Sequence, residues 1–190
     1  MIALLKKLDG WTRKTLRVLT ISIFVALGLL MALNVALRLT NDLSNYLTQK
    51  GYASASATVK ALIPIVSFHW FDEIVELCFA ALVFYGAAAL WASRGHFSVG
   101  DWISPRLPSE RLRAFYKLLT SLISAVFLGV FLWFSFRLAA RSTELTTVFQ
   151  IPKAFLYSCM PISSFIMLMY SVADVWTHAR RLFGDKGAYL

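Results

Sequence analysis

Four long stretches of this sequence contain no charged residue. They cover residues 18–37, 77–93, 118–136 and 154–173, and each is 17 to 20 residues long. A bilayer core about 30 Å thick is crossed by roughly 20 helical residues, because each residue advances the helix by about 1.5 Å. All four stretches meet this requirement. The sequence therefore predicts an all-α polytopic membrane protein with four transmembrane helices, and it excludes a water-soluble enzyme or a nucleic-acid-binding protein.

The remaining charges are divided unevenly between the two sides of the predicted bundle. Only 15% of the residues are charged, against about a quarter in an average soluble domain. Of the 19 basic residues, 13 lie before the first stretch, between the second and third, or after the fourth; the other two connections hold 6. The positive-inside rule places the richer side in the cytoplasm. We therefore expect both termini inside, with basic side chains contacting lipid headgroups.

The chain is predicted to form a single membrane domain over residues 1–190. The expected spans cover about residues 18–38, 74–93, 115–138 and 153–175, with a cytoplasmic loop at 94–114 and an outer-face insertion at 40–70. Residues 1–17 alternate apolar and basic positions at helical spacing, which predicts a short interfacial amphipathic helix before an uncleaved first span. Residues 61–71 are apolar but too short to cross, so we expect a helix or a re-entrant segment there, lying in the outer interface. Pro161 should kink the fourth span.

Few residues in this sequence could carry chemistry. Cys78 and Cys159 lie in different spans and do not form a redox pair. His69, His96 and His178 lie near span ends, without metal-binding spacing or a facing pair for haem. We predict no catalytic, cofactor-binding or metal-binding residue. A small four-helix membrane redox protein or enzyme stays open as an alternative, whereas a self-assembling channel is disfavoured because no span carries a polar stripe.

Charged residues gather at the predicted outer ends of the first three spans. Arg38 ends the first span, Glu73 and Glu76 open the second, and Arg137 ends the third. A charge costs about 2.5–3.5 kcal/mol at mid-bilayer, and less near the edge, so it tends to face protein and pair. We interpret these four residues as an inter-helix polar lock. A docking site for an external protein and a coupling-ion site are the alternatives.

Two further sets of residues are candidates for contacts with neighbouring helices or proteins. Gly86, Ala89 and Ala92 in the second span are small, and small residues let helices approach closely in lipid. They serve either packing within the bundle or contact with another subunit. Asp42 and Glu144 lie in the two outer connections, and we regard them as candidates for docking a soluble partner.

Three motifs of the chain resemble those of the small membrane subunit of tripartite ATP-independent periplasmic (TRAP) transporters. The likeness spans about residues 37–176, and Arg38 is similar to the arginine that ends the family's first span. The motifs are Trp70-Phe-Asp-Glu73 at the start of the second span, Arg94-Gly-His-Phe-x-Val99 followed by Leu107-Pro108, and Ile151-Pro152-x3-Leu156-Tyr157-x3-Pro161 at the start of the fourth.

This resemblance implies a division of labour between three proteins. A large multi-span permease subunit would carry organic acids coupled to sodium, and a periplasmic substrate-binding protein would deliver them. The small subunit would be a non-catalytic scaffold in the bacterial inner membrane that helps to dock the binding protein and needs no cofactor. One departure is that about thirty residues, including Tyr52–Thr58, separate the first two spans where the family often has a short loop. This insertion indicates a subfamily.

Overall fold

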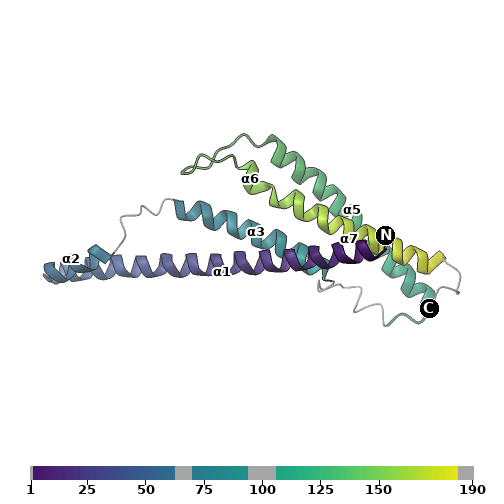
Figure 1. Cartoon of the computed structure of the whole chain (residues 1–190), viewed down its shortest axis with the longest axis horizontal. Helices are drawn as coiled ribbons and strands as arrows, with labels where there is room; N and C mark the ends of the chain where they lie inside the picture. The colour runs from purple at the N-terminus through teal and green to yellow at the C-terminus, as the bar shows by residue number, and fades with distance from the viewer. Residues whose placement is uncertain (1, 63–69, 94–105, 184–190) are drawn as a thin grey trace.

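The structure, a computed structural model, describes residues 2–62, 70–93 and 106–183. Its helices are α1 (Ile2–Gln49), α2 (Ala53–Leu62), α3 (Phe71–Ala92), α5 (Glu110–Arg141), α6 (Ala154–Tyr157) and α7 (Cys159–Phe183) (Figure 1). Within the described residues, four segments are long and apolar enough to cross a membrane: Asp9–Gln49, Phe71–Ala92, Glu110–Arg141 and Ala154–Arg180. The predicted all-α class with four spans is therefore confirmed.

Helix α1 is much longer than the predicted first span. Its 48 residues correspond to about 72 Å at 1.5 Å per residue. The predicted amphipathic segment 1–17 runs into the span without a break, and the first part of the predicted outer insertion continues the same helix. No proline interrupts the chain before residue 50, so nothing in the backbone ends the helix earlier. The helix ends where Gly51 adopts a φ of 84°, a conformation that favours glycine.

Helix α2 folds back against the last turns of α1 and forms the α1–α2 hairpin, residues 39–62 (Figure 1). Ser44 and Ser56 are buried where the two helices meet, with their Oγ atoms 3.2 Å apart. The Thr48 Oγ1 atom lies 2.7 Å from Ser56 Oγ. These short side chains let the backbones approach closely while the hydroxyl groups bond to one another. The sequence did not predict α2. The interfacial helix or re-entrant segment was expected at 61–71, of which residues 63–69 lie outside the described part.

The four spans pack in the order α1, α3, α7 and α5. One buried cluster draws residues from all four: Leu16 from α1, Ala88 and Ala92 from α3, Leu128 from α5 and Met167 from α7. The two alanines have no exposed surface at all. Because they are so small, the larger side chains of the three other helices can meet beside α3.

The fourth span is interrupted near its start, at the position that Pro161 determines. Helix α6 ends at Tyr157 and α7 begins at Cys159, so Ser158 separates them. A proline lacks the amide hydrogen that would bond to the carbonyl group four residues earlier, and its ring clashes with that carbonyl. For Pro161 this is the carbonyl of Tyr157. The predicted distortion is therefore present, and it falls before the proline rather than at it.

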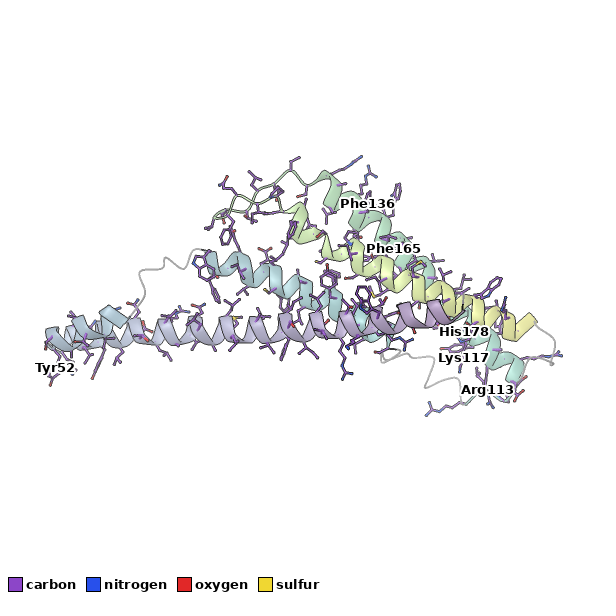
Figure 2. All side chains as sticks on the ribbon, viewed as in Figure 1. Tyr52, Arg113, Lys117, Phe136, Phe165 and His178 are labelled. Carbon is purple, nitrogen blue, oxygen red and sulfur yellow. The ribbon has the colours of Figure 1, made fainter. Side chains whose placement is uncertain are left out.

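Large apolar side chains cover most of the outside of the bundle. Phe24 on α1 is 65% exposed and Phe127 on α5 is 66% exposed. Toward their connected ends, α5 and α7 leave a groove of about 790 Å³ that is lined by residues including Phe136, Pro161 and Phe165; Figure 2 shows the two phenylalanines on neighbouring helices. Water is a poor solvent for such a surface. It requires lipid or the apolar surface of another protein.

Candidate functional site

The candidate site lies at the predicted outer end of the bundle, where α3 begins. The segment between α5 and α6, residues 142–153, reaches back over the first turn of α3 (Figure 1). Glu73 accepts three hydrogen bonds from this segment. Thr147 Oγ1 donates to Glu73 Oε1 at 2.8 Å, the Val148 amide donates to the same oxygen, and the Phe149 amide donates to Glu73 Oε2 at 3.2 Å. We call this arrangement the Glu73 clamp.

The segment held by the clamp is itself a short antiparallel turn, which we call the outer turn. Leu145 and Pro152 form an isolated β-bridge, and the Thr146 amide donates to the Ile151 carbonyl at 2.9 Å. Gln150 closes the turn with a φ of 55°. These bonds hold the amides of residues 148 and 149 together at the tip, where one carboxylate can accept from both.

An exposed ion pair joins the two sides of the outer turn at its base. Lys153 Nζ lies 2.9 Å from Glu144 Oε2, and the Lys153 amide donates to the Glu144 carbonyl at 2.8 Å. The hydrogen bond and charge of Glu144 raise the pKa of the Lys153 ammonium group above its ordinary value. Exposed ion pairs contribute little to stability. The pair's main effect is to fix the direction of both side chains.

The outer turn and the start of α3 also enclose a largely apolar cavity of about 470 Å³. Its lining includes Ile74 and Leu77 from α3 together with Ile151, Pro152 and Leu156. The motif that opens the second span and the motif that opens the fourth therefore lie against each other. The two motifs are about 80 residues apart in the sequence, so this contact could not be predicted from it.

The four residues of the predicted polar lock are not joined to one another. Arg38, Glu76 and Arg137 are all exposed. Within residues 2–62, 70–93 and 106–183, neither arginine forms an ion pair with Glu73 or Glu76. Glu73 does not pair with an arginine because hydroxyl and backbone donors of the outer turn already occupy its carboxylate.

The small residues of α3 face other helices of the same chain. Ala92 is fully buried in the four-span cluster, and Ala89 packs beside that cluster. A β-carbon built on Gly86 would lie 3.6 Å from Thr20 Cγ2 on α1. These contacts correspond to the first of the two interpretations, packing within the bundle.

The two docking candidates lie on separate parts of the outer end. Asp42 is exposed on the α1–α2 hairpin, and Glu144 is exposed at the base of the outer turn. The hairpin extends beyond the start of α3, and Tyr52 lies at its tip (Figure 2). Their exposure is a necessary condition for the predicted docking role.

Sequence reasoning missed a polar contact that ties the beginning of α1 to α7. Tyr170 Oη donates to Asp9 Oδ1 at 2.7 Å, and Arg13 Nη2 lies 2.9 Å from Asp9 Oδ2. The acid and the arginine are four residues apart, a spacing that signals a helical ion pair. Nothing in the sequence indicates that Tyr170 joins them.

The groups available for catalysis or metal binding are scattered. Among the described residues, no group of three or more His, Cys, Asp or Glu side chains could hold a metal ion. Cys78 and Cys159 are free thiols. His178 Nδ1 lies 3.0 Å from Ser121 Oγ, between α7 and α5, whereas His69 and His96 lie outside the described residues.

These features define a multi-pass helical membrane protein in which the Glu73 carboxylate joins α3 to the segment between α5 and α6. The family model of the tripartite ATP-independent periplasmic transporters, DctQ component, matches residues 59–181. The chain belongs to this family, the small permease component of TRAP transporters. No match was found among the curated proteins or the solved structures compared with it. The matched region contains all three motifs, while α1 and the first residues of α2 precede it.

Proposed function

We propose that this chain is the non-catalytic small subunit of a sodium-coupled secondary transporter for organic acids in the bacterial inner membrane. The family match over residues 59–181 carries this proposal. The distribution of acidic residues supports it. The four uncharged stretches contain no carboxylate at mid-depth, so a separate large permease subunit would supply the ion and substrate sites.

The exposed apolar surface supports a scaffolding role. In α1, none of the 18 residues that form its most apolar stretch is buried. The groove between α5 and α7 is open. Helices associate in lipid through close packing. We infer that the large permease subunit covers part of this surface.

Co-purification tests this role directly. The chain carries a tag at its C-terminus, native membranes are extracted in mild detergent, and the proteins that accompany it are identified by mass spectrometry. We expect one large multi-span membrane protein in a stoichiometric amount. Recovery of a well-folded chain alone would contradict the proposal, and a haem or quinone spectrum in that sample would favour the redox alternative.

The second proposed role is to help receive the periplasmic substrate-binding protein at the outer end. The α1–α2 hairpin and the outer turn present Asp42 and Glu144, whose carboxylates attract a complementary cationic surface. This role concerns the rate and strength of docking rather than the substrate itself.

Charge reversal at the outer end tests this second role. We expect Asp42→Lys combined with Glu144→Lys to lower the initial rate of uptake in cells that express the complete transporter, by about tenfold if two attractive contacts become repulsive. The control is Glu110→Lys at the start of α5, on the opposite side. Uptake is measured with labelled substrate and normalised to the amount of the chain in the membrane. Equal rates in the double variant and the control would place the docking surface elsewhere.

A further inference from the structure

Helix α5 ends in two exposed arginines, Arg137 and Arg141, that lie one helical turn apart. Neither has an acidic partner within the described residues, and Glu73, one of the partners predicted for Arg137, is engaged by the outer turn. Two like charges spaced by four residues on one helix repel each other. No acid among the described residues neutralises this pair, so an anion from elsewhere would be attracted to it.

The two guanidinium groups border a cavity of about 430 Å³ beside the end of α5. Ser142, Thr143 and Tyr157 add three hydroxyl groups to its lining. The Glu144 carboxylate also lines the cavity, but Lys153 lies 2.9 Å from it and balances its charge. The lining is consequently rich in hydrogen-bond donors and has a net positive charge.

The same cavity has an apolar side. Phe134 and Leu138 line it from the membrane-spanning part of α5, and both are exposed. Following α5 from Phe134 to Arg141, the surface changes from apolar to cationic at the predicted outer boundary of the bilayer. A phospholipid matches this surface, because its apolar acyl chains lie within the bilayer and its anionic phosphate lies at the boundary.

We propose that this cavity binds the headgroup of an anionic phospholipid in the outer leaflet of the membrane. Guanidinium groups form paired, charge-assisted hydrogen bonds with phosphate oxygens, and the three hydroxyl groups can donate to the remaining ones. The lipid supplies the negative charge that the described residues lack here. The site shares Glu144 with the docking surface proposed above, but its argument rests on Arg137 and Arg141 and not on the transport function.

Lipid binding to the purified full-length chain tests the proposal. Native mass spectrometry compares phosphatidylglycerol with phosphatidylcholine of the same acyl chains, for the wild-type chain and for the Arg137→Gln/Arg141→Gln variant. We expect the wild-type chain to prefer phosphatidylglycerol. Each arginine removed should weaken that binding about fivefold, the usual effect of one basic residue near an anionic surface. Circular dichroism checks that the variant remains helical.

The matched control removes two positive charges from the other end of the same helix. Arg111 and Lys117 are exposed there, and Figure 2 shows Lys117 far from Phe136. We expect Arg111→Gln/Lys117→Gln to weaken binding less than the variant at the cavity. Equal losses would indicate general charge attraction and would overturn the proposal.

A second arm distinguishes a lipid from a soluble anion. Glycerol phosphate carries the phosphate without acyl chains, and we expect its binding to be far weaker than that of phosphatidylglycerol. Equally strong binding that depends on Arg137 and Arg141 would define a site for soluble anions instead. No preference for phosphatidylglycerol in the wild-type chain would also overturn the proposal, and it would favour an acidic segment of another protein as the partner.

Discussion

An Ala88→Leu substitution is expected to destabilise the bundle by about 1–3 kcal/mol, the usual cost of overpacking a well-packed core. Ala88 has no exposed surface, and it lies in the cluster where Leu16, Leu128 and Met167 meet. A leucine side chain adds three carbon atoms at this position. To accommodate them, α3 must move away from the neighbouring helices, and the contacts of all four spans weaken together.

The measurement is the midpoint of thermal unfolding of the purified chain in detergent, followed by circular dichroism. Ala173→Leu on α7 is the matched control, because it adds the same atoms at an exposed position. We expect a clearly lower midpoint for Ala88→Leu and little change for the control. The same midpoint in both variants would show that the cluster does not hold the spans together.

A Glu73→Gln substitution should release the outer turn from α3. The carboxylate accepts from Thr147 and from the amides of residues 148 and 149. Glutamine has the same shape, but it has only one acceptor oxygen and no negative charge, and its amide group is itself a donor. At least one donor of the turn then loses its partner. Hydrogen exchange at the amides of Val148 and Phe149 should become several-fold faster.

Glu76→Gln provides the control for the clamp. Glu76 lies three residues further along α3 and lines the same cavity, but its carboxylate accepts none of the hydrogen bonds of the clamp. Its replacement therefore removes the same charge without removing those bonds. Exchange in residues 142–153 is followed by mass spectrometry of the purified chain. Unchanged exchange in Glu73→Gln, or equally faster exchange in both variants, would contradict the role of the clamp.

The spans were predictable from the sequence because the bilayer imposes a strict requirement. A segment that crosses it must be long, apolar and helical, and four stretches satisfy all three conditions. The ends of the helices were less predictable. Asn41, Asp42 and Asn45 are typical of a loop, yet the structure places them in α1, because the fold of α2 against Ser44 stabilises those turns.

The site could be predicted only in part, because a sequence shows which side chains are charged but not which backbone amides lie beside them. Glu73 was identified as a key polar residue, but its predicted partners were arginines. Its observed partners are one hydroxyl group and two amides from a segment about 75 residues away. Any residue type can supply an amide, so no sequence pattern marks Val148 or Phe149. The same limit applies to Tyr170, whose bond to Asp9 depends on how α7 lies against α1.

The continuity of α1 has a mechanical consequence. A single helix carries both the contact of Asp9 with α7 and the α1–α2 hairpin at the opposite end. The end near Asp9 is held in the bundle, because Tyr170 donates to Asp9 and Leu16 is buried among residues of the other spans. Since no break separates that end from the hairpin, the anchored turns of α1 also set where the hairpin lies relative to the other three spans.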